Sequence, residues 1–395
     1  MTTTIDNEHK TFNVPNLRFP EFEGEWEETR LKEISKFSKE RLNSIELSCS
    51  NYVTTENMLQ DYKGIVSATN LPTNTNVVKF SKGDVLLSNI RPYLKKVWYA
   101  DRNGGCSADV FVFKALPICN SNFLHHVIAN DRFIKFVMGG AKGVKMPRGD
   151  KEQMITYKVG FPCIEEQKKI ANLLSLLDER ISTQNKIIED LKKLKSAIIE
   201  WHYGQVEKQN VCIGDLGEPF NVGNLAKEDL TETGMPCVIY GELFTTYGET
   251  ISQIESHTNK AEGMILSKKG DLLFPSSTTV DAMSLIAPSV INVDGVILGG
   301  DMFGIHITPN FNAQYLSYYF NHIAKRQLAK FAKGSTIIHL HYADIEKAKL
   351  LLPSLEEQNR MANCLISLDT KINIESIFIS LLNSQKAYLL RQMFI

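Results

Sequence analysis

The chain has 395 residues, of which 43% are hydrophobic and 23% are charged, and its formal net charge is −1. This balance excludes a disordered or collagen-like chain, and it also excludes a uniformly basic nucleic-acid binder. The length allows two or three domains. Because the net charge is close to zero, any nucleic-acid surface must be a local patch that acidic residues elsewhere offset.

The first residues, Met1–Glu8, show neither the basic start nor the apolar stretch of a secretory signal. No apolar run in the sequence reaches the ~18 residues of a membrane span, so we expect a cytoplasmic protein. The seven cysteines are widely spaced and include no C-x-x-C pair. We therefore expect reduced structural thiols rather than a disulfide framework or a zinc ribbon.

Both halves of the chain predict short strands separated by turn residues, followed by a helix. In the first half we expect strands at Asp84–Ser88, Val97–Ala100 and Val110–Lys114, and a helix at Asn122–Gly139. In the second half we expect strands at Asp271–Phe274, Leu285–Ala287 and Phe303–Thr308, and a helix at Ala313–Ala332. This mixture indicates the α+β fold class for two globular domains.

A long internal repeat relates the two halves. Phe161–Gln167 (FPCIEEQ) recurs as Leu352–Gln358 (LPSLEEQ) at an offset of 191 residues (353 − 162), and 13 of the 43 positions from 161–203 match 352–394 without a gap. The offset drifts upstream, which predicts a variable globular domain before an element of fixed length. The upstream matches are Lys82–Leu87 with Lys269–Phe274, Asp109–Phe111 with Asp301–Phe303, and Ala141–Gly143 with Ala332–Gly334.

The fixed element in each half carries a heptad pattern of apolar residues over about four heptads. The predicted seam residues are Ile170, Leu174, Leu177, Ile181, Ile188, Leu191 and Ile198 in the first copy, and Met361, Leu365, Leu368, Ile372, Ile379, Leu382 and Leu389 in the second. Polar residues interrupt both seams at matched positions, Gln184 with Glu375 and Lys195 with Lys386.

Each of these elements begins after a proline, and neither proline nor glycine interrupts 164–203 or 355–395. We predict two helices of about 60 Å that form an antiparallel coiled coil and hold the two globular domains at a set distance. The alternative is a pair of unrelated amphipathic helices, each packed on its own domain.

Polar loops at corresponding places in both halves are the candidate nucleic-acid contacts. Arginine, lysine, asparagine, serine and threonine contact base edges and phosphates, and glycine lets a backbone approach closely. The candidates are Thr69, Asn70, Ser88, Asn89, Arg91, Lys95, Lys96, Lys142, Lys145 and Arg148, and then Thr245, Thr246, Ser276, Ser277, Thr278, Lys333, Ser335, Thr336, His339 and His341. Simple solvated turns are the alternative, but a Gly-rich basic loop recurs at the same place in both halves.

Motifs for catalysis are missing from the sequence. It contains no phosphate-binding loop, no G-x-G-x-x-G and no Asn/Asp-Pro-Pro-aromatic motif. His339 and His341 could form a metal pair but lack a further ligand at a suitable spacing. Asp84 and Asp271 follow Lys-Gly turns, where we interpret them as turn caps. We therefore expect no catalytic residue and no bound metal.

The motifs of the repeat resemble those of the specificity subunit of type I restriction–modification systems. The similar parts are Pro-x-x-Glu-Glu-Gln at 162–167 and 353–358, the Ala-Asn, Leu-Asp and Ile positions that follow, and the opening Pro15–Phe22 with Trp26. The resemblance covers essentially the whole chain. It implies two target-recognition domains joined by two long antiparallel helices, with an internal pseudo-two-fold duplication.

The resemblance also implies what each part does. After a leader at 1–25, recognition domains at 26–160 and 206–350 would each bind one half of a bipartite site in double-stranded DNA. Spacer helices at 161–205 and 351–395 would set the gap and dock two methyltransferase (modification) subunits. Restriction/translocase subunits would join the complex. S-adenosylmethionine, ATP and Mg²⁺ would be used by the partner subunits, and this chain would need no cofactor.

Two other functions remain open from the sequence. A coiled-coil scaffold without a nucleic-acid role would explain the helices, and a stand-alone DNA-modifying enzyme would explain the polar loops. The missing catalytic motifs argue against the enzyme.

Overall fold

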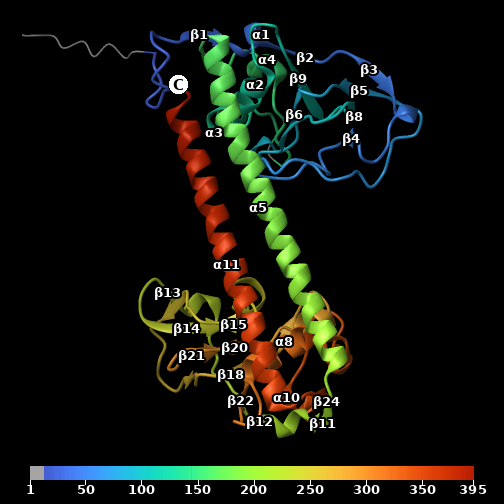
Figure 1. Cartoon of the computed structure of the whole chain (residues 1–395), viewed down its shortest axis with the longest axis vertical. Coiled ribbons are helices and arrows are strands. Elements are labelled where there is room, and N and C mark those ends of the chain that lie inside the picture. The colour runs from blue at the N-terminus through green and yellow to red at the C-terminus, as the bar shows by residue number, and fades with distance from the viewer. Residues whose placement is uncertain (1–12, 144) are drawn as a thin grey trace, which may run out of the picture. The chain divides into compact units, whose positions relative to one another are not determined.

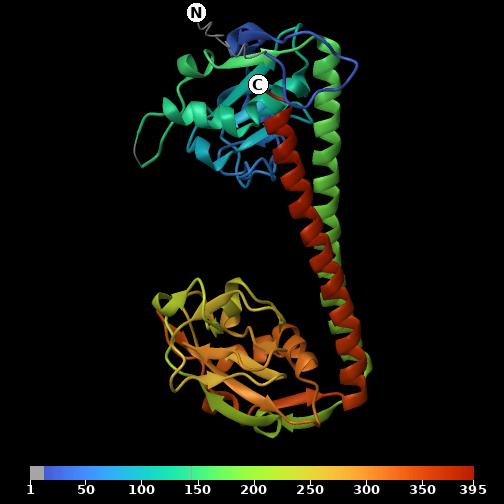
Figure 2. The same ribbon diagram turned by 90° about the vertical axis from the view of Figure 1, so that its left-hand side faces the viewer.

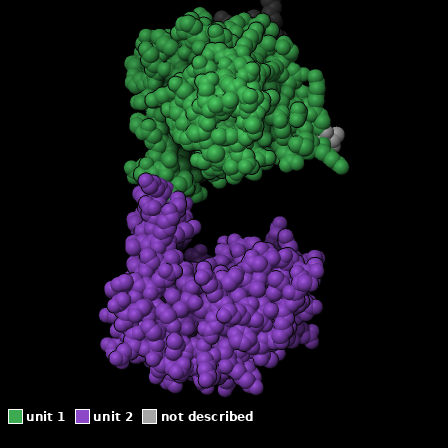
Figure 3. All heavy atoms as spheres, turned by 90° about the vertical axis from the view of Figure 1, so that its right-hand side faces the viewer, with its two compact units in different colours: residues 1–185, 377–395 green, residues 186–376 purple. Residues whose placement is uncertain are grey.

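The computed structural model describes residues 13–143 and 145–395 (Figures 1 and 2). The chain divides into two compact units, unit 1 with residues 1–185 and 377–395 and unit 2 with residues 186–376 (Figure 3). Two long helices, α5 (Ile164–Gln205) and α11 (Leu355–Gln392), each contribute to both units. The long helices are therefore confirmed as predicted. No helix in the described part of the chain is long and apolar enough to cross a lipid bilayer.

Unit 1 is built on two four-stranded sheets. The first sheet is antiparallel and consists, in order, of β2 (Ser35–Phe37), β9 (Val110–Ala115), β6 (Val85–Ser88) and β7 (Val97–Tyr99). The second consists of β3 (Arg41–Asn43), β5 (Asn76–Phe80), β8 (Gly104–Cys106) and β4 (Tyr52–Val53). Leu87 and Phe113 face one core while Leu86 and Val112 face the other. Burial of both faces explains the unbroken apolar runs of β6 and β9.

Unit 2 repeats this plan with two five-stranded sheets. The first consists of β12 (Gly217–Asn221), β22 (Met302–Ile307), β18 (Asp271–Pro275), β20 (Ser289–Ile291) and β15 (Thr250–Ile251). The second consists of β13 (Leu230–Thr231), β16 (Ser256–Thr258), β14 (Met235–Ile239), β21 (Ile297–Gly299) and β17 (Ile265–Leu266). The internal duplication is thus visible in the fold as well as in the sequence.

A short antiparallel strand pair precedes each long helix. In unit 1, β1 (Glu27–Arg30) pairs with β10 (Lys158–Phe161), and β10 leads into α5. In unit 2, β11 (Gln209–Cys212) pairs with β24 (Lys349–Leu352), and β24 leads into α11. The same kind of strand pair therefore precedes the first residue of both long helices.

Most predicted strands are present, but the strand expected at Leu285–Ala287 is wrong. Leu285 is the last residue of α7 (Ala282–Leu285), whose start is capped by Asp281 through the N–H of Ser284 at 2.7 Å. The strand of the sheet begins only after Pro288, as β20. Apolar composition alone could not separate this short helical turn from the strand that follows it.

The two domain helices predicted as continuous are both broken. The first is α2 (Ser121–Ile128) followed by α3 (Asp131–Gly139), because the side chain of Asn130 accepts the N–H of Arg132 and caps a new helix. The second is α8 (Ala313–His322) followed by α9 (Lys325–Leu328) and a 3₁₀ turn. Helices α2 and α8 contribute to the main apolar core of their units, together with residues of the long helices.

The Lys-Gly-Asp turns are built alike in both units, as the sequence predicted. Asp84 accepts the N–H of Ser81 at 2.8 Å, and Asp271 accepts the N–H of Lys268 at 2.8 Å. The glycine before each aspartate has a positive φ of 91°, a conformation that favours glycine. Both carboxylates are therefore turn caps.

The glutamine of each Pro-x-x-Glu-Glu-Gln motif fixes a long helix to the neighbouring domain helix. Gln167 is 1% exposed, donates to the proline carbonyl of its own motif at 2.9 Å and accepts the N–H of Asn120 at 2.9 Å. Gln358 makes the same two bonds, with Asn312 as donor at 3.0 Å. Asn120 and Asn312 are the N-caps of α2 and α8. One buried amide thus ties the starts of two helices together, which gives the repeated motif a physical role.

The opening segment of the chain that carried part of the resemblance closes unit 1. Arg18 makes two bonds of 2.8 Å to Glu166, the second glutamate of the first motif, whose side chain is 1% exposed. This hydrogen bond raises the pKa of Arg18. Leu17 donates its N–H to the carbonyl of Gln392 at the end of α11. The predicted leader therefore packs on both long helices, although its residues 1–12 lie outside the described part.

The predicted seam is confirmed on both long helices. Every predicted seam residue, from Ile170 to Ile198 on α5 and from Met361 to Leu389 on α11, is buried or half-buried. The polar residue Lys195 on this seam is buried as well. A buried lysine needs a partner, and its partner lies on the other helix.

Two salt bridges join the long helices, and each is the counterpart of the other. In unit 1, Lys386 of α11 bonds to Asp178 of α5 at 2.5 Å. In unit 2, Lys195 of α5 bonds to Asp369 of α11 at 2.7 Å. The two lysines occupy one position of the repeat and the two aspartates another. Since the later residue on α5 meets the earlier residue on α11, the helices are antiparallel, as predicted.

In unit 2 the salt bridge extends into the globular part. Lys195 also lies 3.1 Å from Glu249, and Tyr318 of α8 donates to Asp369 at 2.6 Å. Burial alone would raise the pKa of Glu249, but the hydrogen bond from His322 and the charge of Lys195 outweigh it and lower that pKa to about 2. The network therefore connects both long helices to the domain through charged, desolvated groups.

Replacing Lys195 by methionine should destabilise the protein by about 2–4 kcal/mol, because Asp369 and Glu249 would lose the ammonium group that both of them contact. Chemical denaturation followed by circular dichroism measures this loss. Lys193→Met is the matched control: Lys193 lies on the same helix, is 68% exposed and pairs with Glu189. That exposed pair should contribute about 0.5 kcal/mol or less. Equal losses in the two variants would contradict the structural role of Lys195.

Candidate nucleic-acid interface

Three chain segments meet at the candidate loop of unit 1. Asn89, directly after β6, donates its N–H to the carbonyl of Asp109 at 2.8 Å. The carbonyl of Asn89 accepts the N–H of Gly149 at 3.2 Å, and Arg91 donates to the carbonyl of Pro147 at 2.8 Å. The segment after β6 is therefore held between the start of β9 and the Gly-rich basic loop.

Unit 2 repeats the same frame with other side chains. Ser276, directly after β18, donates its N–H to the carbonyl of Asp301 at 2.7 Å and accepts the N–H of Leu340 at 2.9 Å. Strands β19 (Ser277–Thr278) and β23 (Ile338–His339) extend this pairing. The structure thus brings two separate groups of predicted contacts, one around Ser276 and one in the basic loop, into one place.

Each Gly-rich loop is closed by two backbone hydrogen bonds. Lys142 and Arg148 exchange theirs at 3.0 and 2.9 Å, and Lys333 and His339 exchange theirs at 2.9 and 2.7 Å. Gly334 has a φ of 117°, and a Cβ placed on it would lie 2.0 Å from the carbonyl oxygen of Ile337. Only glycine fits there.

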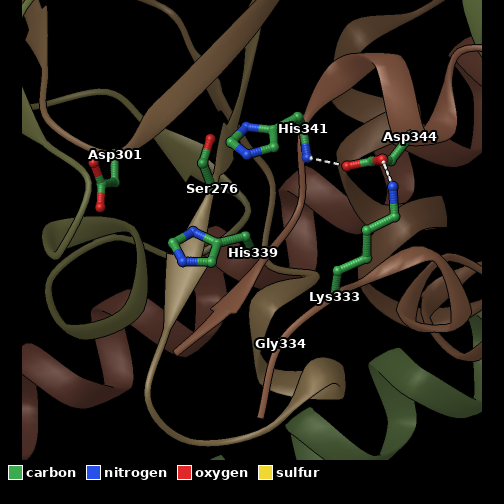
Figure 4. A pocket seen from close by; sticks show the side chains of 7 residues that line it. All are labelled: Ser276, Asp301, Lys333, Gly334, His339, His341 and Asp344. Carbon is green, nitrogen blue, oxygen red and sulfur yellow. Dashed lines mark hydrogen bonds and ion pairs between the residues drawn. The ribbon is translucent and has the colours of Figure 1, made fainter. Parts of the chain in front are cut away.

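The loop of unit 2 borders an open hollow of about 560 Å³ (Figure 4). It is lined by Ser276, Asp301, Lys333, Gly334, His339, His341 and Asp344. The rings of His339 and His341 lie with their centroids 6.1 Å apart and their planes nearly parallel. This is an accessible concavity on the predicted surface, lined by polar and charged residues, of the kind that can admit part of a nucleotide.

Carboxylates pair with the opening lysine of each loop. Lys142 bonds to Asp150 at 2.7 Å, and Lys333 bonds to Asp344. These hydrogen bonds are the main cause of the lowered pKa of both aspartates. Asp150 and Asp344 were not among the predicted site residues. The sequence indicates a functional role for these aspartates only weakly, because each lies after its loop at the start of a short helix, where an aspartate is common as a cap.

Thirteen of the predicted contacts are exposed as a DNA contact requires. They are Thr69, Asn70, Arg91, Lys142, Lys145, Arg148, Thr245, Thr246, Lys333, Ser335, Thr336, His339 and His341. Arg91 also has a positive φ of 51°, which is unusual for a side chain of its size. Whether these residues touch DNA stays a prediction.

Several other predicted contacts have internal partners instead. Ser88 and Ser277 are buried and donate their hydroxyl groups to the carbonyl of Ile90 and to Asp301. Lys95 and Lys96 are half-buried, and their ammonium groups bond to Asp131 at 2.8 Å and to the carbonyl of Thr55 at 2.6 Å. These four side chains therefore have structural partners inside the domain, and a role in contacting DNA stays a prediction for them.

Two predicted pairs lie on other elements. Thr69 and Asn70 follow Ala68, which donates its N–H to the carbonyl of Cys49 at 2.8 Å and not to the basic loop. Thr245 and Thr246 lie at the end of α6 (Glu242–Thr245). Asn89 and Thr278 are half-buried within the loop frames themselves.

The sequence comparisons assign the family. The chain matches the family described as "Type I restriction modification DNA specificity domain" twice, over residues 23–193 and 205–381. It therefore belongs to this family. The two matches correspond to the two copies of the internal repeat.

Relatives with names agree with this assignment. The chain is 26% identical over 402 residues to the type I restriction enzyme MjaVIII specificity subunit of Methanocaldococcus jannaschii, covering 91% of this chain and 89% of that protein. It is 24% identical over 281 residues to a putative specificity subunit, S.HindORF215P, of Haemophilus influenzae, covering 68% and 70%.

Solved structures share the fold. The crystal structure of the type I restriction–modification S subunit from M. genitalium superposes with a TM-score of 0.63 at 16% identity, covering 97% of this chain and 99% of that one. A chain from a structure of type I system assembly and conformational transition gives a TM-score of 0.54 at 18% identity, covering 92% and 96%. The α+β architecture with two recognition domains and long helices is therefore that of the family.

Replacing Gly334 by alanine should open the loop of unit 2, because the added Cβ collides with the carbonyl of Ile337. Hydrogen exchange of the amides of Lys333 and His339 should rise about tenfold or more, corresponding to about 1–2 kcal/mol of local stability. Gly263→Ala is the matched control, since its φ of 71° is also positive but nothing lies within 4 Å of its Cβ. Unchanged protection of the loop in Gly334→Ala would contradict the close approach described here.

Proposed function

We propose that this chain supplies the DNA sequence specificity of a type I restriction–modification complex, and that each recognition domain binds one half of a bipartite site. The single observation that supports this most is the repeated loop frame with exchanged side chains. A frame with Arg148 in one domain and His339 in the other suits two half-sites of different sequence. A homodimer would instead present two identical binding surfaces, which suit a palindromic DNA site.

The long helices would act as the spacer between the half-sites. This role is supported by the two reciprocal salt bridges, which fix the register of α5 on α11 in each unit. A buried polar contact on a heptad seam is well suited to setting register. The gap in the DNA target would then follow from the length of the helices rather than from the loops.

The long helices would also dock two modification subunits. Apolar side chains are exposed at regular spacing on α5 within unit 2, at Ile187, Leu194 and Trp201, with exposures of 39, 47 and 67%. On α11 within unit 1, Ile377, Leu381 and Tyr388 are 54, 62 and 53% exposed. Exposed apolar stripes that include aromatic residues are typical of protein interfaces.

The remaining chemistry would belong to the partners. We propose that the chain itself is non-catalytic and acts in the cytoplasm. S-adenosylmethionine would be used by the modification subunits, and ATP with Mg²⁺ by restriction/translocase subunits. In this scheme the chain determines which half-sites are bound and the spacing between them, and the partners carry out methyl transfer to adenine.

Co-expression with the modification subunit and mapping of methylated adenines across the host genome tests the proposal. We expect the two proteins to co-purify and a single bipartite motif to become methylated. No new motif despite co-purification would favour a scaffold without a DNA role. Methylation or cleavage by the purified chain alone would favour a stand-alone enzyme.

A variant sharpens the docking part of this test. Trp201→Ala should weaken association with the modification subunit about tenfold or more, as expected for an exposed aromatic at an interface centre. Met235→Ala is the control, because Met235 is an exposed apolar residue on β14 of the same unit. Equal retention of the partner by both variants would place the docking surface elsewhere.

A further inference from the structure

The two loop frames differ in chemistry at one equivalent position. Arg148 and His339 each exchange two backbone hydrogen bonds with the lysine that opens their loop. The residue after each of them donates its N–H to the residue that follows the central strand. In unit 1, Gly149 donates to the carbonyl of Asn89 at 3.2 Å, and in unit 2, Leu340 donates to the carbonyl of Ser276 at 2.9 Å. Backbone geometry therefore places Arg148 and His339 at the same point of the frame, independently of the sequence alignment.

His339 is an exposed side chain of the hollow that can face a ligand. The carboxylate of Asp344 is bonded to Lys333, and Asp301 accepts the hydroxyl of Ser277 at 2.8 Å. Within the described residues, no hydrogen bond involves the ring nitrogens of His339, and the residue is exposed. Figure 4 shows its ring in the hollow between Ser276 and Gly334.

Arginine and histidine at this position would bind DNA differently. A guanidinium is charged at all physiological pH values and can donate two parallel bonds to guanine O6 and N7. A neutral imidazole offers one donor and one acceptor, whereas the protonated ring offers two donors and a positive charge. Histidine changes between these forms near pH ~6.5. Phosphates and the acceptor atoms of bases favour the protonated form.

We propose that Arg148 and His339 are equivalent specificity-determining residues, and that protonation of His339 strengthens binding of the second half-site while the first half-site is insensitive to pH. This inference rests on the proposed function and adds a regulation that acts on one domain alone. The ligand at each position is double-stranded DNA, contacted through base-edge acceptors or phosphate oxygens.

The charged and titratable groups that line the hollow with His339 are Asp301, Lys333, His341 and Asp344. Lys333 and Asp344 are paired with each other, and Asp301 accepts the hydroxyl group of Ser277. If the protonated ring binds DNA more tightly, affinity for the second half-site rises as the pH falls through the histidine range.

The test uses the complex of the full chain with its modification subunit and duplexes that carry the mapped motif. One duplex has the first half-site scrambled and another has the second, and dissociation constants are measured at constant salt at about pH 8 and about pH 6. The half whose recognition is lost in Arg148→Ala is assigned to unit 1. We expect binding through the second half-site to tighten about tenfold at the lower pH, and binding through the first to change less than about twofold.

Reciprocal variants separate His339 from other titrating groups. His339→Arg should abolish the pH dependence of the second half-site and move its base preference toward guanine at one position. Arg148→His should create pH dependence in the first half-site. His257→Gln is the control, because His257 lies on β16 of unit 2, outside the hollow. Circular dichroism confirms that each variant is folded.

The outcomes distinguish this inference from the function on which it rests. A bipartite motif with equal pH dependence in both halves, or with pH dependence retained in His339→Arg, would overturn the inference and leave the proposed function standing. Loss of all sequence preference in the wild-type complex would overturn the proposed function and the inference with it.

Discussion

The partly buried salt bridge between a lysine and an aspartate on the two long helices is the interaction on which the rest of the structure depends. Its two copies are reciprocal: each helix contributes the lysine to one pair and the aspartate to the other. A lysine on an apolar seam is costly unless its partner is in place, so only one register of the helices is favoured. Ile170 and Leu174 of α5 also belong to the core of unit 1, and Met361 and Leu365 of α11 belong to that of unit 2, so each long helix is packed into the core of one globular part.

On this fixed frame, the duplicated domains vary where variation is tolerated. The buried glutamines of the two motifs make the same bonds at nearly the same distances, and the Lys-Gly-Asp turns have the same φ. The loops keep their backbone hydrogen bonds but exchange arginine for histidine and asparagine for serine. Backbone bonds tolerate such exchanges because they do not involve the atoms of the side chains. A duplicated protein can in this way present two different surfaces without changing its scaffold.

Periodicity and repetition made much of this predictable. The heptad spacing and the offset of 191 residues predicted the long helices, their antiparallel seam and the α+β halves. The same sequence misplaced the strand at Leu285–Ala287, because a four-residue helix and a short strand have no distinct period. It did not show that Ser88 and Ser277 are buried, since composition does not reveal which hydroxyl groups have partners inside the domain. The partners of Lys195 and Lys386 needed the fold, although both lysines stood out as interruptions of the seam.

The central claim is that the long helices fix the spacing while the loops determine the sequence that is bound. Inserting one heptad after Ile187 in α5 and one after Phe378 in α11 tests it most directly. Both insertions fall between the two salt bridges and preserve the phase of the seam, so both domains keep their attachment. Mapping of methylated adenines should then show two unchanged half-sites separated by a longer gap. A changed half-site sequence, or an unchanged gap in a complex that still methylates, would contradict the account.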